Sequence, residues 1–320
     1  MSRLVIIGAG AWGTALALQA VRAGNDVSLV ARDAATASTI AANRESNRLP
    51  AHRLPDAVDV RHDIPAGADL LLWVVPVQHL RSSFLRLQPA VGSIVVGAKG
   101  VEAGTYLLPL EIVNEVSPGG PVAILTGPNF AHEVASGFPA AAVVASTDAD
   151  LRERVRLMLG TNTFRLYGND DPIGAQLGGA AKNVIAIAAG AVIGAGLGEN
   201  ARAALVTRGL SELRRLAIAL GGRAETVMGL SGLGDLLLTC TGASSRNFSL
   251  GHALGRGESL SDILARRSEV TEGVPTAAAL VARGEGVELP ICRAVADLLA
   301  GAKTLDQAIA QLLLRPQRDE

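Results

Sequence analysis

One lysine stands near the start of a long apolar, alanine-rich segment in the middle of the chain. Lys182 and Asn183 follow the sequence Gly-Gly-Ala-Ala, and the next charged residue along the chain is Glu199. Moving an unpaired ammonium group out of water carries a large free-energy cost or lowers its pKa, so such a lysine is usually paired or used in a reaction. Two interpretations follow. Lys182 either transfers protons in a reaction, or its long side chain reaches from the start of a helix to solvent.

A second polar cluster lies further along the chain. Ser245, Arg246 and Asn247 come directly before a helical pattern, so a hydroxyl, a guanidinium group and an amide meet at a helix start, which suits a phosphate group. The alternative is a helix N-cap beside a surface arginine. A Gly-Leu-Gly-Asp turn ends at Asp235, whose carboxylate either caps a helix or orients Lys182 and shares its charge.

A glycine-rich turn follows the first apolar run of the chain. Residues 4–7 are Leu-Val-Ile-Ile, and Gly8, Gly10 and Gly13 then stand in a Gly-x-Gly-x-x-Gly spacing before an alanine-rich helical pattern. In this motif the glycines allow a tight turn, the close approach of a diphosphate and helix–strand packing, while free N–H groups at the helix start bind the anion. Because residues 27–31 read as the next strand, the context predicts dinucleotide binding.

An arginine ends that next strand. Sites selective for NAD usually have an acid there, which accepts hydrogen bonds from the ribose hydroxyls, but here Arg32 comes first and Asp33 second. Arginine can instead pair with the 2′-phosphate of NADPH. The order favours NADPH and leaves NADH possible; the alternative is a solvated loop arginine without a cofactor contact.

Continuous apolar runs predict the buried strands of a parallel sheet. They are residues 70–76, 93–98, 121–125 and 140–145. Lys99 and residues 127–129 follow two of these runs, at strand ends where ligands bind in open α/β sheets, although Lys99 could also be a solvated strand-end lysine. From about Asp171 every periodic segment predicts helix. We therefore expect an α/β fold in which an N-terminal Rossmann-type doubly wound sheet, residues 1–172, is followed by an all-α C-terminal domain, residues 173–320.

The composition excludes several classes of function. The 320 residues leave room for two domains, and the formal net charge of −1 argues against a nucleic-acid-binding surface. Cys240 and Cys292 cannot make a disulfide framework, so we expect buried, unreactive thiols and a cytoplasmic location. The longest uncharged run, residues 183–198, has 16 residues where a bilayer span needs about 20, which predicts a core helix and no membrane insertion.

These motifs occur in one order along nearly the whole chain. They are GAGAWG at residues 8–13, GPNFA at 127–131, GGAAKNVIA at 178–186, GLGDL at 232–236, SRN at 245–247 and EG at 272–273. In this order the chain closely resembles bacterial NAD(P)-dependent glycerol-3-phosphate dehydrogenases, and the lysine helix and the GLGDL segment are the most specific parts. The family often has Ser where Asn129 stands, Glu where Gln176 stands and Ser where Val77 stands. These departures put in doubt only the exact affinity for ligands.

The resemblance implies a reaction. Dihydroxyacetone phosphate is reduced by NADPH, or by NADH, to sn-glycerol 3-phosphate for phospholipid synthesis, with Lys182 as proton donor and acceptor. The residues implied around the substrate are Lys99, Gly127, Asn129, Lys182, Asp235, Ser245, Arg246 and Asn247. Besides Gly8, Gly10 and Gly13, the residues implied along the cofactor are Ala11, Trp12, Arg32, Lys99, Ala131, Arg246, Val270 and Glu272. We expect a homodimer without a metal or a nucleic-acid partner.

Two other functions fit part of the sequence. A β-hydroxyacid dehydrogenase also combines a nucleotide-binding domain with a lysine on a glycine-rich helix, but that family usually has Met where Trp12 stands. A non-catalytic dinucleotide-sensing regulator would need neither the lysine helix nor the Ser-Arg-Asn cluster. Turnover of NADPH with dihydroxyacetone phosphate would distinguish the enzyme from the regulator.

Overall fold

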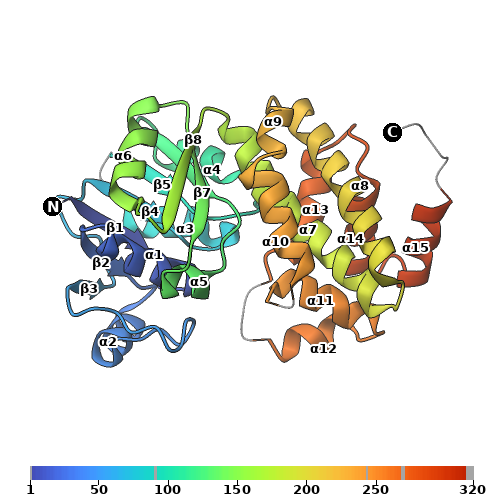
Figure 1. The fold of residues 1–320 in the computed structure, drawn as a ribbon, viewed down its shortest axis with the longest axis horizontal. Coiled ribbons are helices and arrows are strands. Elements are labelled where there is room, and N and C mark those ends of the chain that lie inside the picture. Colours follow the sequence, from blue (N-terminus) through green and yellow to red (C-terminus); the bar gives the residue numbers. More distant parts are fainter. Residues whose placement is uncertain (1, 90–91, 243, 268–270, 315–320) are drawn as a thin grey trace. The chain divides into compact units, whose positions relative to one another are not determined.

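The computed structural model describes residues 2–89, 92–242, 244–267 and 271–314, which divide into two compact units (Figure 1). Unit 1 consists of Met1–Lys99 and Leu108–Gln176, and unit 2 of Gly100–Leu107 and Leu177–Glu320. The sequence analysis expects a single division between residues 172 and 173. The first turn of the long helix that begins there belongs to unit 1, where the Gln176 side-chain amide accepts the Leu110 N–H at 2.8 Å.

Unit 1 is built around an eight-stranded sheet with the strand order β3-β2-β1-β4-β5-β6-β7-β8. Its strands are β1 (Arg3–Ile7), β2 (Asp26–Val30), β3 (Val58–Arg61), β4 (Leu70–Trp73), β5 (Ile94–Val96), β6 (Val122–Thr126), β7 (Ala140–Ala145) and β8 (Phe164–Asn169). Neighbouring strands are parallel except for β6 and β7, which are antiparallel. The predicted apolar runs all contribute strands, and their order confirms the Rossmann-type sheet.

Helices cover both faces of this sheet. They are α1 (Ala11–Arg22), α2 (Ala34–Asn43), the short 3-10 helix η1 (Val77–His79), α3 (Leu80–Leu87), α4 (Pro109–Val116), α5 (Ala131–Ser136) and α6 (Ala149–Leu159). Leu4 and Ile6 of β1 share one core with α1, α5 and α6. On the other face Trp73 of β4 stacks on Phe84 of α3, with 3.8 Å between the ring centroids. Alternate side chains of the central strands therefore enter different cores, as a doubly wound sheet requires.

The sequence analysis missed the two edge strands, β3 and β8. Their sequences, Val-Asp-Val-Arg and Phe-Arg-Leu-Tyr-Gly-Asn, alternate between apolar and polar residues. A strand at the edge of a sheet leaves part of its side chains to solvent, so it lacks the continuous apolar run of the central strands.

The regular secondary structure in the described part of unit 2 is all helical. Its helices are α7 (Pro172–Gly194, which begins in unit 1), α8 (Gly198–Ala219), α9 (Ala224–Val227), the π-helical turn η2 (Leu230–Gly234), α10 (Asp235–Thr241), α11 (Arg246–Gly255), α12 (Leu260–Ala265), α13 (Gly273–Arg283), α14 (Pro290–Leu299) and α15 (Leu305–Leu313). Among the described residues, α7 alone is long and apolar enough to cross a membrane, and 83% of its most apolar window is buried inside the structure. It is a core helix, as predicted.

Glycines let α7 and α11 cross at close range. A Cβ atom added at Gly190 of α7 would lie 2.0 Å from the carbonyl oxygen of Phe248, and one at Gly251 of α11 would lie 1.9 Å from that of Ile187. Any larger residue at either position would push the two helices apart. The crossing therefore holds the start of α11 at a set place along α7.

Candidate active site

The glycine turn of unit 1 joins β1 to α1 and has the geometry of an anion-binding loop. Gly8 has φ 118° and its N–H donates to the Val30 carbonyl at 2.9 Å. A Cβ at Gly13 would lie 1.8 Å from the Gly8 carbonyl oxygen, so helix and turn pack backbone to backbone. A Cβ at Gly10 would meet no described atom within 4 Å, and no side chain caps α1 there. The space beside Gly10 is thus open and no side chain caps the first N–H groups of α1, which fits the diphosphate of a dinucleotide.

The strand next to this turn ends at an exposed arginine. The Arg32 side chain is 87% exposed, and its Nε donates to Asp33 Oδ2 at 3.0 Å. Asp33 is the N-cap of α2 and accepts the Thr36 N–H at 2.8 Å. That backbone hydrogen bond, followed by bonds from the Thr36 and Arg32 side chains, lowers the pKa of Asp33 to about 2. The carboxylate is engaged in capping, while the Arg32 guanidinium has donors left for a phosphate.

The ends of β5 and β6 bring three of the predicted substrate residues together. Lys99 is half-buried, and its Nζ donates to the Gly127 carbonyl at 3.1 Å. Gly127 has φ 135°, a conformation that favours glycine. The Asn129 amide donates to the Ala141 carbonyl at 3.0 Å, while its Oδ1 is buried and accepts no hydrogen bond from the described residues. This acceptor suits a ligand hydroxyl or amide.

In unit 2 the predicted lysine forms a buried ion pair. Lys182 Nζ lies 2.6 Å from Asp235 Oδ1 and donates to the Thr239 hydroxyl at 3.1 Å. The side chain of Lys182 is 10% exposed and that of Asp235 is fully buried. The lysine is therefore mostly buried and does not extend into solvent, and Asp235 is not a helix cap but the partner of the ammonium group.

A π-helical turn brings the two helices into register. The sequence analysis places a compact polar turn at Gly-Leu-Gly-Asp, whereas the structure has the π-helical turn η2 running directly into α10. A Cβ at Gly178 would lie 2.3 Å from the Ser231 carbonyl oxygen, so α7 and η2 touch there. Lys182 and Asp235 each follow that contact by four residues, about one helical turn. The close contact therefore sets the ion pair one turn further on.

The sequence analysis missed Thr239. It lies one turn after Asp235 on α10, and its hydroxyl donates to the Asp235 carbonyl at 2.6 Å while accepting a hydrogen bond from Lys182. The signal in the sequence was the i, i+4 spacing of an acid and a hydroxyl on one helix face, which gains meaning only once that face is known to meet Lys182.

The Ser-Arg-Asn segment forms the start of α11. Ser245 is the N-cap and accepts the Phe248 N–H at 3.2 Å, and Arg246 begins the helix with an exposed side chain. The buried Asn247 amide donates to Asn183 Oδ1 at 2.9 Å and accepts the N–H of Gly273 at 3.0 Å.

The Asn247 side chain thus ties α7, α11 and α13 together, a structural role that the sequence analysis did not foresee. Asn183 Nδ2 is buried and finds no acceptor within the described part of the chain.

The other predicted cofactor residues are spread over both units. Ala11 and Trp12 begin α1, and a Cβ at Gly97 would lie 3.4 Å from Trp12 Nε1, so this glycine leaves room for the indole ring. Ala131 begins α5 in unit 1, and Glu272 is the N-cap residue of α13 in unit 2. Val270 lies outside the described residues.

Both cysteines are buried and free. Burial raises the pKa of Cys240 to about 12, and burial also raises that of Cys292. Their thiols therefore stay protonated at neutral pH, as expected of unreactive cysteines. The described residues contain no group of three or more His, Cys, Asp or Glu side chains that could hold a metal ion.

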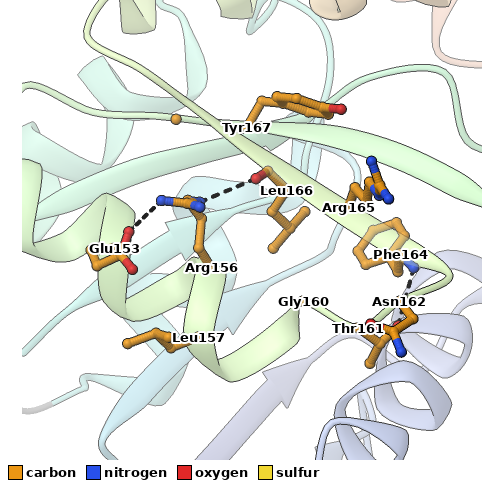
Figure 2. Close-up of a pocket in the computed structure, with 11 residues that line it drawn as sticks. Glu153, Arg156, Leu157, Gly160, Thr161, Asn162, Phe164, Arg165, Leu166 and Tyr167 are labelled. Carbon is orange, nitrogen blue, oxygen red and sulfur yellow. Dashed lines mark hydrogen bonds and ion pairs between the residues drawn. The ribbon is translucent and has the colours of Figure 1, made fainter.

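A cavity of about 510 Å³ lies between α6 and β8, away from every predicted site residue (Figure 2). Arg156 forms an ion pair with Glu153 and donates from Nε to the Leu166 carbonyl at 3.2 Å, as Figure 2 shows. None of the residues that line this cavity is among the predicted site residues, so the cavity takes no part in the arrangement described above.

Comparisons with known proteins cover nearly the whole chain. The family model described as NAD-dependent glycerol-3-phosphate dehydrogenase N-terminus matches residues 3–152, and the corresponding C-terminus model matches residues 171–310. A protein of Acidiphilium cryptum named glycerol-3-phosphate dehydrogenase, NAD(P)+, is 54% identical over 317 residues, which cover 98% of this chain and 97% of the relative. A protein of the same name from Gluconobacter oxydans is 50% identical over 323 residues, or 99% and 98% of the two chains.

The fold has a solved relative as well. The crystal structure of a glycerol-3-phosphate dehydrogenase from Coxiella burnetii is similar with a TM-score of 0.93 and 36% identity, and the match covers 98% of this chain and 99% of that one.

Proposed function

The chain belongs to the NAD-dependent glycerol-3-phosphate dehydrogenase family, and we propose on this premise that it reduces dihydroxyacetone phosphate to sn-glycerol 3-phosphate. We propose NADPH as the preferred cofactor and NADH as a possible one. The product would supply the backbone of phospholipids. The chain is thus an NAD(P)-dependent oxidoreductase rather than a β-hydroxyacid dehydrogenase or a regulator without activity.

The observation that carries the proposal is the buried ion pair of unit 2. An ammonium group held by a buried carboxylate keeps its position in surroundings of low dielectric, where its effect on a developing negative charge is large. The Lys182–Asp235 distance of 2.6 Å and the added bond to Thr239 provide this support. A buried ion pair adds little net stability, so the burial of Lys182 favours a role other than stabilising the fold.

Lys182 is the proposed general acid. When bound, NAD(P)H supplies the hydride that reduces the carbonyl carbon. Lys182 Nζ then gives a proton to the carbonyl oxygen as negative charge develops there, and it takes a proton back in the reverse reaction. A general acid of this kind contributes roughly 10²–10⁴ to the rate.

We assign the phosphate of the substrate to Ser245, Arg246 and Asn247 of unit 2. The exposed Arg246 side chain begins α11, where its guanidinium group and the N–H groups of the first turn offer donors to a phosphate. Because the Asn247 amide is used between helices, its contribution to the ligand is its backbone N–H.

From unit 1 we assign Lys99, Gly127 and Asn129 to the substrate. Lys99 adds positive charge beside the Gly127 carbonyl, and the unbonded Asn129 Oδ1 accepts a hydrogen bond from a hydroxyl group. The cofactor assignment rests on the glycine turn, Ala11, Trp12, Arg32 and Lys99, with Ala131, Arg246, Val270 and Glu272 assigned by family membership.

Initial rates test the proposed reaction. The protein is expected to oxidise NADPH when given dihydroxyacetone phosphate and to ignore unphosphorylated dihydroxyacetone at equal concentration, because binding of the remote phosphate orients the carbonyl group. The decrease in NADPH absorbance over time measures both rates. Comparable turnover of the two ketones would contradict the phosphate assignment, and no turnover of either would favour a dinucleotide-sensing protein.

We also propose a cytoplasmic homodimer. The two free, buried cysteines suit a reducing compartment. Light scattering of the purified protein is expected to give twice the 32.8 kDa of one chain. A mass of one chain at micromolar concentration would contradict the dimer and leave the reaction assignment unaffected.

A further inference from the structure

A buried serine outside the motifs contacts the glycine turn of unit 1. Ser46 follows α2 and is 1% exposed. Its hydroxyl donates to the Ala9 carbonyl at 3.0 Å and accepts the N–H of Arg48 at 3.3 Å. Ala9 is the residue between the first two glycines of the turn, so a side chain from another segment anchors the loop that is assigned to the diphosphate.

This contact has a direct consequence for the peptide group that joins Ala9 to Gly10. In a planar trans peptide the C=O of one residue and the N–H of the next point in opposite directions. Holding the Ala9 carbonyl against Ser46 therefore points the Gly10 N–H to the opposite side. The turn is anchored at Gly8 by the Val30 carbonyl, and the Ser46 hydroxyl provides the corresponding anchor one residue later.

The segment that carries Ser46 is itself well anchored. The N–H of Leu49 donates to the Ser46 carbonyl at 2.8 Å, and the N–H of Leu54 donates to the Arg44 carbonyl at 2.7 Å. Leu49 and Leu54 are both buried in the core shared with β1 and α1. The position of the Ser46 hydroxyl is thus set by the packing of unit 1 and not by the turn that it contacts.

We propose that Ser46 is a positioning residue for the dinucleotide, which acts by holding the Ala9 carbonyl so that the backbone N–H groups of the turn face the diphosphate. The inference rests on the proposed use of NAD(P)H. NADPH and NADH share the diphosphate and differ in the 2′-phosphate, so loss of the Ser46 hydroxyl weakens the binding of both cofactors equally.

The test is a set of fluorescence titrations of Ser46→Ala with NADPH and with NADH. Loss of one hydrogen bond that orients the turn is expected to raise both Kd values by about five- to tenfold. The kcat at saturating NADPH is expected to stay within about twofold of the parent, because the reacting groups are untouched. As a competitor, ADP loses affinity by the same factor, whereas adenosine 2′-monophosphate, which lacks the diphosphate, does not. Ser46→Thr keeps the hydroxyl and retains the parent Kd.

Ser146 offers a matched control in the same unit. It is also 1% exposed, and its hydroxyl donates to the Val122 carbonyl at 2.6 Å and accepts the N–H of Asp148, two residues on, at 3.1 Å. Ser146→Ala removes the same kind of hydrogen bonds from unit 1 without touching the turn. It is expected to lower the Tm about as much as Ser46→Ala and to leave both Kd values unchanged.

Three outcomes would overturn the inference: unchanged affinity in Ser46→Ala, a loss confined to NADPH, or an equal loss in Ser146→Ala. If circular dichroism shows that Ser46→Ala does not fold, Ser46→Cys, which keeps the size of the side chain but is a weaker donor, is held to the same criteria. A parent protein that binds neither NADPH nor NADH would contradict the proposed function instead, so the two failures are distinguishable.

Discussion

At the scale of single residues, the proposed chemistry depends on how Asp235 and Thr239 hold one ammonium group. Lys182 uses one donor on the carboxylate and one on the hydroxyl, and the hydroxyl is itself oriented by the Asp235 carbonyl. This chain of bonds leaves the side chain little freedom. A general acid is most effective when its geometry exists before the substrate arrives, and the buried pair provides that condition.

Replacing the lysine tests its role in proton transfer. Lys182→Arg keeps the positive charge but does not release a proton near neutral pH, so we expect kcat to fall by at least about 10², nearly as far as in Lys182→Ala. NADPH affinity, measured by fluorescence, should stay within a few-fold of the parent. Lys303→Arg is the matched control, because Lys303 forms a partly exposed ion pair with Asp297 at 2.8 Å in the same unit. If Lys182→Arg kept most of the parent kcat, proton transfer would have to be assigned to another group, and Lys99 would be the first to examine.

A second prediction at this scale concerns cofactor choice. Arg32→Ala is expected to weaken NADPH by about tenfold or more and to leave NADH nearly unchanged, because only NADPH carries a 2′-phosphate for the guanidinium group. Kd values of both cofactors measure the difference. Arg81→Ala, which removes a surface ion pair with Glu115 elsewhere in unit 1, is the control and should change neither Kd. An equal loss for both cofactors would mean that Arg32 shapes the loop and does not select the phosphate.

At the scale of elements, the π-helical turn η2 decides where α10 meets α7. Gly178 lets the Ser231 carbonyl approach the α7 backbone, and one turn later Lys182 meets Asp235. A π-helical turn is rare and occurs frequently at functional sites, because it shifts the register of the following helix. Here that shift places a carboxylate and a hydroxyl on the face that meets the lysine.

A side chain at Gly178 would prevent the close contact between α7 and η2, and we expect it to lower both stability and catalytic rate. In Gly178→Ala the new Cβ would lie 2.3 Å from a backbone oxygen, which no side-chain rotation relieves. We expect a loss of about 1–3 kcal/mol in the free energy of unfolding, measured by urea denaturation, and a fall in kcat larger than the change in KM.

Gly242 at the end of α10 supplies the control for this variant. A Cβ there would make ordinary contacts at 3.9 and 4.0 Å, so Gly242→Ala should change neither stability nor rate appreciably. If Gly178→Ala kept the parent stability and kcat, the close contact between α7 and η2 could not be what sets the ion pair.

At the scale of the whole molecule, the two units carry different parts of the proposed reaction. Unit 1 contains the glycine turn, Arg32 and the strand ends with Lys99, while unit 2 contains the buried ion pair and the start of α11. Binding of the cofactor at these residues is therefore expected to stabilise unit 1 directly. A ligand that binds only the folded state adds stability that grows with its concentration relative to its Kd.

The last prediction follows from that linkage. NADPH at about 100 times its Kd should stabilise the protein by about 2.7 kcal/mol and raise the Tm in a thermal scan. Dihydroxyacetone, which has neither the dinucleotide nor the phosphate, should leave the Tm unchanged at the same concentration. A Tm that does not respond to NADPH would contradict dinucleotide binding by the glycine turn.

Local patterns in the sequence predicted the class of fold, which the structure confirms, and they drew attention to the residues to which the chemistry is assigned. The spacing of Gly8, Gly10 and Gly13 directly after an apolar run predicts the nucleotide turn, because each glycine answers a steric requirement between neighbours in the chain. The single charge of Lys182 in an apolar segment likewise marks this residue as paired or reactive. The free-energy cost of burying an ammonium group depends on the apolar residues around it, and many of these belong to its own helix.

Tertiary structure decided what these residues touch. Lys182 meets Asp235 across 53 positions of the chain, Asn247 reaches Asn183 across 64, and Ser46 reaches Ala9 across 37. Each of these contacts depends on how two elements pack, and the packing depends on close approaches such as Gly178 on η2, which no periodicity within one segment encodes. A residue's type follows from the sequence, but whether its hydroxyl or amide serves a ligand, a neighbouring helix or the backbone of a turn depends on which surfaces the fold brings within hydrogen-bond distance.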